Sequence, residues 1–139
     1  MIDWGSNEFH SVVDMPEEYT ILDLSRGVWS QPETTFSVGK YDEFRPNLYN
    51  TDLFGGERNM HIGIDIGGPV GTPCMAFMDG VISQFGYNPE PGDYGNVIIT
   101  KHEIGGVPLW ALYGHLNAAS IEGIEVGDRV EAGEVIAWF

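Results

Sequence analysis

Positive charge is scarce in this 139-residue chain, and its shortage excludes several classes of partner. The sequence has six lysine and arginine residues against 21 aspartate and glutamate residues, which gives a formal net charge of −15. A surface of this sign repels phosphate backbones and anionic lipid headgroups. We therefore expect no nucleic-acid partner, no membrane surface and no binding driven by anionic wall polymers.

Cysteine and long apolar runs are equally scarce. Cys74 is the single cysteine, so no internal disulfide can form, and its neighbours Pro73 and Met75 favour a small buried hydrophobic residue over a nucleophile. The first residues lack a basic segment followed by an apolar stretch, so no signal peptide is visible. No segment approaches the length of a membrane-spanning helix. From these absences we expect a cytoplasmic location for the chain as given.

Helical periodicity is missing as well, and short alternating runs take its place. The chain has 19 glycines, many of them in turns between such runs. Alternation of apolar and polar residues predicts strands, and Gly- and Pro-rich clusters predict the turns between them. The predicted strands cover residues 19–24, 61–66, 75–85, 96–102, 109–116, 124–126 and 129–139. The fold class is therefore mainly β.

The chain divides into two parts that differ in the regularity of their apolar–polar periodicity. Residues 1–58 show no clean periodicity, which predicts an N-terminal arm and a loop-rich cover packed on the domain. Residues 59–139 carry the regular strand pattern and form the β domain proper. Trp110 and Trp138 lie in predicted strands of this part, and we expect both in the core.

A histidine and a carboxylate share the polar face of the strand 61–66. His61 and Asp65 alternate with three isoleucines, which are expected to face inward, and both are good zinc ligands. In a straight strand, residues four apart are separated by roughly 13 Å, too far to share one ion. We therefore predict a bend at Gly63 that brings His61 and Asp65 together. The alternative is a surface His and Asp on the wet face of an edge strand.

His115 ends a strand whose alternation places it on one face with Leu109, Ala111 and Tyr113. An imidazole titrates near neutral pH, so a histidine presented at a strand end suits a general acid or base. The alternative is a core histidine satisfied by a backbone carbonyl. His102, between Lys101 and Glu103, is interpreted as a solvated strand end, and His10 lies in the unpatterned arm.

A collinear series of motifs resembles the lysostaphin- and LytM-type zinc endopeptidases. The blocks follow the order of that family at compatible spacing, and they cover residues 59–139. They are His61-Ile-Gly-Ile-Asp65-Ile-Gly-Gly-Pro-Val-Gly-Thr-Pro73, Ala76 to Ile82, Tyr94 to His102, Leu112-Tyr113-Gly114-His115-Leu116, and Val126 to Ala137.

This resemblance implies a barrel-sandwich hybrid of antiparallel strands and a function. By resemblance, His61 and Asp65 are zinc ligands and His115 is the catalytic histidine, facing them across a groove. The implied reaction is hydrolysis of peptide bonds in bacterial peptidoglycan by a metal-activated water. Family members are often exported.

The sequence departs from the family in one respect. The family completes its site with an H-x-H pair that supplies the third ligand, and this chain ends at Phe139 without one. Because such sites use three protein ligands and a water, we expect weak zinc binding and little peptidase activity from this chain. We also expect the unpaired strand edge to allow a homodimer.

Two other functions compete with the peptidase. The first is a non-catalytic binding or regulatory module of the same fold within a larger intracellular multidomain protein, for which an absent H-x-H pair is the test. Gly39 to Arg45, with Tyr49 and Phe54, resembles a subgroup in which the domain is fused to kinase-like and aminotransferase domains in intracellular proteins. Val126 to Gly133 also resembles biotinyl and lipoyl carrier domains. Carriers need a lysine at a hairpin tip, and neither Lys40 nor Lys101 lies in such a turn, which excludes a carrier.

Overall fold

The computed structural model describes residues 2–49, 55 and 58–139, and these form two compact units. One unit comprises Met1–Asp14, Val70–Pro89 and Tyr94–Phe139, and the other comprises Met15–Pro69 and Glu90–Asp93. Both are built from strands and turns, so the mainly β class is confirmed. Within the described residues, no helix is long or apolar enough to cross a bilayer. The sequence division at residue 58 stays a prediction, and Phe54 lies outside the described residues.

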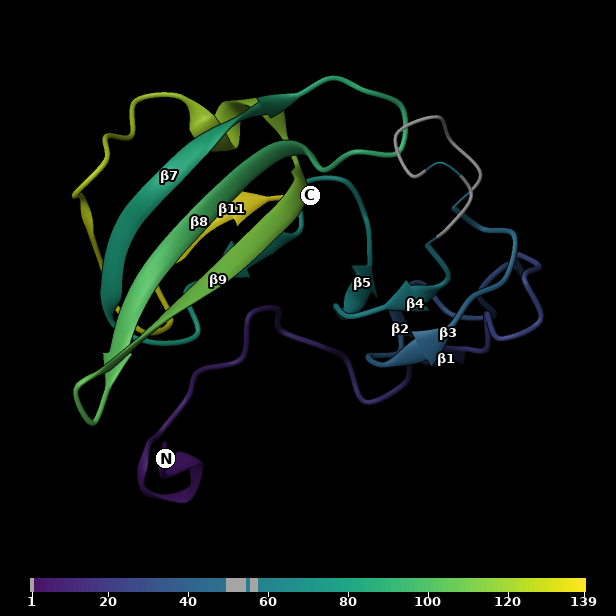
Figure 1. Cartoon of the computed structure of the whole chain (residues 1–139), viewed down its shortest axis with the longest axis horizontal. Coiled ribbons are helices and arrows are strands. Elements are labelled where there is room, and N and C mark those ends of the chain that lie inside the picture. The colour runs from purple at the N-terminus through teal and green to yellow at the C-terminus, as the bar shows by residue number, and fades with distance from the viewer. Residues whose placement is uncertain (1, 50–54, 56–57) are drawn as a thin grey trace. The chain divides into compact units, whose positions relative to one another are not determined.

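A curled antiparallel sheet dominates the first unit (Figure 1). Its strands are β7 (Gly80–Asn88), β8 (Gly95–Ile104), β9 (Val107–Leu116) and β10 (Arg129–Val130), in the order β10-β7-β8-β9. A two-residue turn of Gly105 and Gly106 joins β8 to β9, and both glycines have positive φ. Residues without a side chain adopt these angles at no steric cost, and the resulting turn suits the twist of an antiparallel pair.

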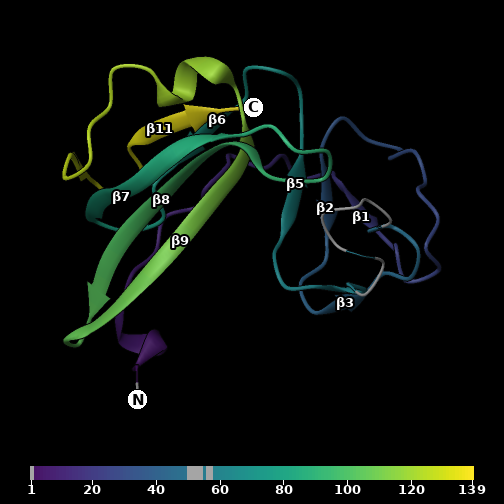
Figure 2. The ribbon, with the colours of Figure 1, turned by 45° about the horizontal axis from the view of Figure 1, so that its top comes forward.

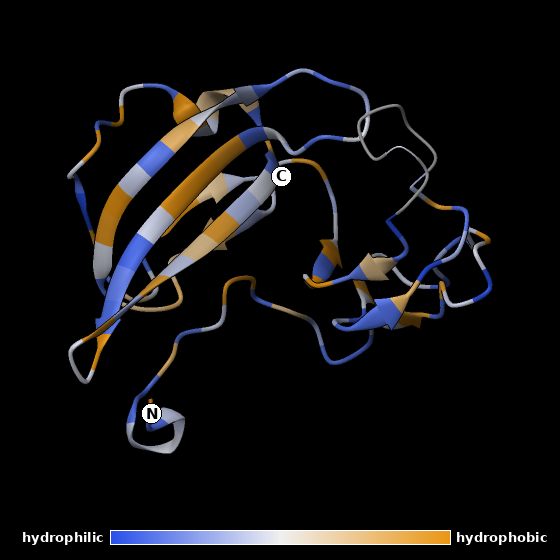
Figure 3. Cartoon of the chain, viewed as in Figure 1, coloured by the Kyte–Doolittle hydropathy of each residue, from blue (hydrophilic) through white to orange (hydrophobic). Residues whose placement is uncertain are grey.

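A second, two-stranded sheet covers one face of this sheet, as two views show (Figures 1 and 2). It pairs β6 (Pro73–Met75) with β11 (Val135–Trp138). Apolar side chains from both sheets share one core, which comprises Cys74, Ala76, Ile82, Ile98, Tyr113, Leu116, Val130 and Ala137. The burial of Cys74 is thereby confirmed. Burial alternates along β8 from Ile98 to Ile104 because only one face of the strand meets this core. Its hydropathy does not alternate in the same way: Figure 3 shows a hydrophobic stretch in the first half of β8 and a hydrophilic stretch in the second.

The N-terminal segment belongs to the same unit. It opens with a short 3-10 helix, η1 (Trp4–Ser6), and then runs beside β6. The amide of Met75 donates to the carbonyl oxygen of Val12, and the amide of His10 donates to that of Phe77. Another 3-10 helix, η3 (Ala118–Ile121), follows β9.

Several predicted strands of this unit differ from the observed ones. The predicted strand 75–85 is interrupted between β6 and β7, and the predicted strand 129–139 is interrupted by a turn at Ala132 and Gly133. Residues 124–126 lead into a turn instead of forming a strand. Trp110 and Trp138 are 55% and 39% exposed, so their assignment to the core is wrong. Trp110 lies opposite Lys101 on the open face of the sheet, where the ammonium sits 5.7 Å from its ring centre.

The second unit contains two small sheets. One has the order β1-β2-β5, with β1 (Thr20–Leu22) parallel to β2 (Ser37–Gly39) and β2 antiparallel to β5 (Asp65–Gly67). The other pairs β3 (Glu43–Phe44) with β4 (Met60–His61). The predicted strand at 19–24 is thus confirmed as β1, whereas the predicted strand 61–66 is divided between β4 and β5.

Candidate metal and catalytic residues

The chain bends between His61 and Asp65. Strand β4 ends at His61, a bend follows at Gly63, and β5 begins at Asp65. The Nε2 atom of His61 lies 3.3 Å from Oδ1 of Asp65, so the predicted bend is confirmed. Ile62 and Ile64 are 76% and 64% exposed, so the expectation that they face inward is wrong. The bend interrupts the alternation on which that expectation depended.

The imidazole of His61 is oriented by its other nitrogen. Nδ1 lies 3.0 Å from the carbonyl oxygen of Lys40. A carbonyl oxygen only accepts hydrogen bonds, so Nδ1 is the donor, and Nε2 is the nitrogen that faces Asp65. A Cβ atom at Gly63 would lie 3.3 Å from Nε2, so the glycine leaves this nitrogen accessible. This is the arrangement in which a metal-ligating histidine has its tautomer fixed by a backbone carbonyl.

The separation of the two atoms fits a zinc ion. Two ligands at tetrahedral positions, each about 2.0–2.2 Å from zinc, lie about 3.3–3.5 Å apart. The 3.3 Å between Nε2 of His61 and Oδ1 of Asp65 falls in this range. The side chain of Asp65 is 49% exposed and that of His61 is 17% exposed, so both are accessible to an ion from solvent. These two residues could therefore hold a metal.

A buried charge cluster holds the second oxygen of Asp65. Nη1 of Arg45 donates to Oδ2 of Asp65 at 2.8 Å, and Nε of Arg45 donates to Glu43 at 2.8 Å. Glu43 also accepts from the amide of Leu24 at 3.2 Å and lies 3.2 Å from the ammonium of Lys40. Burial alone would raise the pKa of Glu43, but these hydrogen bonds and positive charges outweigh burial, and the pKa is lowered.

Sequence reasoning did not place Arg45 at the site. Its side chain is 5% exposed, and its partner Asp65 lies 20 residues further along the chain. Buried arginine is rare unless it is paired with carboxylates. The sequence gives one weak local indication of this cluster. Glu43 and Arg45 lie two residues apart in a short extended segment, so their side chains share one face.

The part of the chain that the structure describes adds no third metal ligand to the pair. Among the described residues, no group of three or more His, Cys, Asp and Glu side chains is arranged to hold a metal ion. His10 is exposed, with Nδ1 2.7 Å from the carbonyl oxygen of Ser11. His102 is 2% exposed and uses both ring nitrogens, one towards Thr100 Oγ1 at 2.6 Å and one towards the carbonyl oxygen of Asp79 at 2.9 Å. The interpretation of His102 as a solvated strand end is thus wrong, because alternation along β8 places it on the core face with Thr100.

His115 lies at an irregularity in β9. Its φ is 57°, a left-handed value that residues with a side chain rarely adopt, and the β8–β9 register shifts at this point. The irregularity ends the predicted alternation, so Tyr113 is buried and His115 is exposed. The interpretation of His115 as a core histidine is therefore wrong. Its ring lies 6.2 Å from that of Tyr94.

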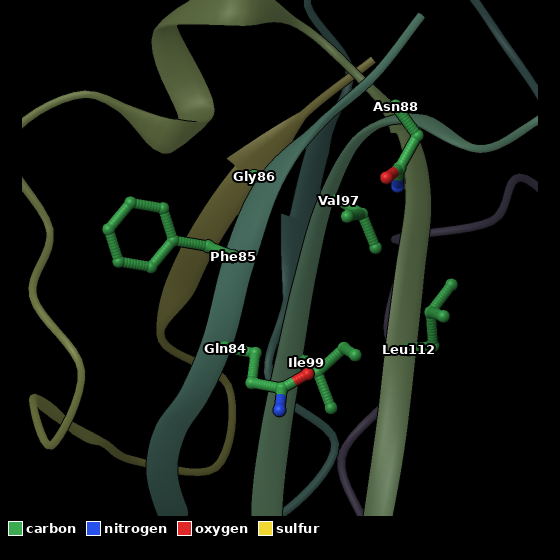
Figure 4. A pocket seen from close by; sticks show the side chains of 7 residues that line it. All are labelled: Gln84, Phe85, Gly86, Asn88, Val97, Ile99 and Leu112. Carbon is green, nitrogen blue, oxygen red and sulfur yellow. The ribbon is translucent and has the colours of Figure 1, made fainter. Parts of the chain in front are cut away.

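A hollow of about 290 Å³ lies on the open face of β7, β8 and β9. Figure 4 shows Val97 and Ile99 of β8 between the strand carrying Gln84 and Asn88 and the strand carrying Leu112. Strand pairing places Asn88 opposite Gly95, and Asn96 opposite Leu116. The Asn88 end of the hollow is thus the end of the sheet at which His115 lies.

Comparison with known proteins gives a family match over this region. Residues 59–139 match peptidase family M23. The chain is 38% identical over 79 residues to the DD-carboxypeptidase/endopeptidase Mpg of Neisseria meningitidis serogroup B and to that of Neisseria gonorrhoeae, covering 57% of this chain and 16% of each relative. It is also 38% identical over 78 residues to the glycyl-glycine endopeptidase ALE-1 of Staphylococcus capitis, covering 56% of this chain and 20% of that protein. The chain therefore spans a fifth or less of the length of these relatives. No solved structure matches it.

Proposed function

Because this chain belongs to peptidase family M23, we propose that it is a zinc metallopeptidase-like domain in which His61 and Asp65 hold the metal and His115 is the catalytic histidine. The observation that carries the proposal is the convergence of Nε2 of His61 and Oδ1 of Asp65 at 3.3 Å. The remaining polar atoms of both side chains are engaged by Lys40 and Arg45. Both groups are thus oriented before any ion arrives.

The proposed chemistry divides between the metal and the protein. Zinc, when bound, supplies a Lewis acid that polarises a carbonyl group and makes water more acidic. His61 and Asp65 bind and orient it. The exposed imidazole of His115 can accept a proton from water and return it to the leaving amine, which is the role of a general base and acid. That His115 acts on the same reaction centre stays a prediction.

We propose a peptide of the peptidoglycan type as the substrate. Both groups of relatives are named endopeptidases, and one name specifies glycyl-glycine bonds. The hollow beside β7 has an apolar floor and two carboxamide side chains, Gln84 and Asn88. Carboxamides donate to and accept from peptide groups, so this surface suits an extended peptide with small side chains.

Peptidase activity of the chain by itself should be low. The described residues supply two metal-binding groups, whereas catalytic zinc sites use three protein ligands. The second candidate function is therefore a non-catalytic binding or regulatory module of the same fold, within a larger intracellular multidomain protein. The observation that favours it is that the described residues bring no third metal-binding side chain to His61 and Asp65.

We also propose that β9 can join two copies of the chain. It is the terminal strand of its sheet and is ten residues long. A terminal strand presents unpaired amide and carbonyl groups to another edge. Analytical ultracentrifugation of the wild type and a Leu112→Pro variant would test this, since proline removes an amide and disfavours edge pairing. A monomeric wild type at high concentration would refute the dimer.

Zinc content tests the central proposal. Protein purified without chelators is dialysed against micromolar zinc and measured by elemental analysis, together with His61→Ala, Asp65→Asn and, as a matched control, His10→Ala. We expect bound zinc in the wild type and in His10→Ala, and its loss in the other two variants. Equal zinc in all four proteins would remove the metal site. An assay of glycine-rich peptide hydrolysis, with and without added zinc, then distinguishes the two candidate functions. Zinc-dependent hydrolysis supports the peptidase, and no hydrolysis supports the non-catalytic module.

A further inference from the structure

We propose that Arg45 is a positioning residue that holds Asp65 in the orientation required for metal binding. The inference rests on the proposed function, because it concerns the same metal pair. Arg45 touches neither substrate nor metal in this proposal. It acts through the carboxylate of Asp65, whose Oδ2 atom it contacts at 2.8 Å.

The two oxygens of Asp65 have different partners. Oδ2 accepts from Nη1 of Arg45, and Oδ1 is the oxygen 3.3 Å from Nε2 of His61. A carboxylate with one oxygen held this way presents a single oxygen to an ion. Because the side chain of Asp65 is 49% exposed, few other contacts restrict its rotation. Arg45 thus fixes which oxygen faces His61.

Arg45 is itself held in place from several directions. Nε donates to Glu43 at 2.8 Å, Nη1 to the hydroxyl of Tyr49 at 3.3 Å, and Nη2 to the carbonyl oxygen of Lys40 at 3.5 Å. Its side chain and that of Glu43 are each 5% exposed. The guanidinium is planar and rigid, so anchoring it at these points also fixes the nitrogen that contacts Asp65.

The backbone carbonyl group of Lys40 contacts both His61 and Arg45. Its carbonyl oxygen accepts from Nδ1 of His61 and also lies within reach of Nη2 of Arg45. One peptide group therefore contacts both the imidazole and the guanidinium that positions the carboxylate. The orientation of each ligand is coupled to the other through this turn.

Gly39 accommodates the ion pair against strand β2. Gly39 pairs with Asp65 in the antiparallel register, and a Cβ atom there would lie 2.6 Å from Oδ2 of Asp65 and 2.8 Å from Nη2 of Arg45. A Cβ atom at position 39 would require the side chain of Asp65 or Arg45 to shift. The glycine at position 39 therefore leaves the space that Arg45 and Asp65 occupy.

Two opposing effects on metal affinity can be separated by experiment. A guanidinium near a zinc ion repels it, whereas an oriented carboxylate binds it better. Partners that orient metal ligands in this way typically contribute about 10–100-fold to metal affinity. We infer that orientation dominates, because Glu43 compensates the charge of Arg45 inside the cluster.

The experiment measures zinc affinity of the full chain by competition with a chromophoric chelator. Arg45→Met alone leaves Glu43 buried without its guanidinium, which could impair folding. The main comparison is therefore Glu43→Gln against the double variant Glu43→Gln/Arg45→Met, in which neither buried charge is left unpaired. Arg26→Met removes an exposed cation of the same unit and serves as the control for net charge. Circular dichroism and urea unfolding confirm that each variant is folded.

The expected result is that Arg26→Met binds zinc within about threefold of the wild type. Glu43→Gln keeps a hydrogen-bond acceptor for Nε of Arg45 but no longer offsets its charge, so it binds zinc no more tightly than the wild type. The double variant binds about 10–100-fold more weakly than Glu43→Gln. Equal affinity of the double variant and Glu43→Gln would overturn the positioning role, and so would tighter binding by the double variant. If the wild type itself binds no zinc, the proposed function fails, and the inference fails with it.

Discussion

The backbone amide of His115 donates a 2.7 Å hydrogen bond to the carbonyl oxygen of Tyr94, and His115 has a left-handed φ of 57°. The bond ties the end of β9 to the residue that precedes β8. A left-handed backbone costs roughly 1–2 kcal/mol for a residue with a Cβ atom. The exposed imidazole is therefore presented at a conformational cost, which is a common property of functional residues.

Glycine at position 115 should relieve this cost. We expect His115→Gly to be at least as stable as the wild type, because the left-handed conformation costs glycine nothing, although its greater freedom in the unfolded chain offsets part of the gain. His115→Ala keeps the strain and should be about 1 kcal/mol less stable than His115→Gly. Urea unfolding of the three proteins measures the difference. A glycine variant less stable than the alanine variant would show that the left-handed backbone at position 115 carries no cost for a residue with a Cβ atom.

Thr100 is completely buried, and its hydroxyl is the partner of His102 Nε2. Thr100→Val keeps the shape but removes this hydrogen bond, which leaves a buried ring nitrogen unsatisfied. We expect a loss of about 1–3 kcal/mol in the free energy of unfolding. Thr35→Val, at an exposed position, is the control and should change stability by less than about 0.5 kcal/mol. Similar losses in both variants would mean that the buried hydrogen bond contributes little.

The thiol of Cys74 should make stability depend on pH above neutrality. Burial raises the pKa of Cys74 from 9.0 to about 11. Below pH 9 both the folded and unfolded chains keep the thiol protonated, and its full contribution is present. As pH rises from 9 towards 11, the unfolded chain loses this proton first, so the contribution falls, by about 2–3 kcal/mol in total.

The Cys74 effect is measured as a difference between two proteins. Urea unfolding of the wild type and Cys74→Ala at pH 8 and pH 10.5 cancels the other groups that titrate in this range. We expect the wild type to lose more stability than Cys74→Ala over this interval. The folded wild type should also react slowly with thiol reagents at pH 8, and the urea-unfolded chain quickly. Parallel pH profiles would contradict the raised pKa.

Gly133 has a φ of 82°, and a Cβ atom there would lie 2.8 Å from Cδ2 of His10. Gly127 has a φ of 97° with open space around it. We expect both Gly133→Ala and Gly127→Ala to lose about 1–2 kcal/mol from backbone strain. Only Gly133→Ala should also displace His10.

Hydrogen exchange distinguishes these two effects. The amide of His10 donates to the carbonyl oxygen of Phe77, so it is protected while the N-terminal segment stays against β6. Its exchange should accelerate in Gly133→Ala beyond the acceleration in Gly127→Ala. Equal exchange rates in the two variants would show that His10 adapts to the added methyl group.

The sequence predicts the regular parts of the molecule well. Strands β8 and β9 were expected at 96–102 and 109–116, within a few residues of their observed bounds, because alternation and the Gly105–Gly106 turn are local signals. The bend at Gly63 was also predictable, because a straight strand cannot bring His61 and Asp65 together.

The errors have a common physical origin. Alternation assigns residues to one face or the other but does not show which face is covered, so Trp110 was wrongly placed in the core. Alternation also fails where the backbone is irregular, as at Ile62, Ile64 and His115. Arg45 was missed because its contact with Asp65 joins segments 20 residues apart, which no local pattern reveals.

The pairing of β6 with β11 has a consequence for how the chain is made. Pro73 in β6 lies opposite Trp138 in β11, 65 residues later in the sequence, and Ala137 fills the core against side chains from much earlier in the sequence. During synthesis on the ribosome, β6 and the apolar side of β7 and β8 emerge long before their cover does. Nascent chains whose strand partners are synthesised much later expose apolar surface and are prone to aggregate until those partners emerge. A stop codon before Val135 would therefore leave an aggregation-prone product without β11.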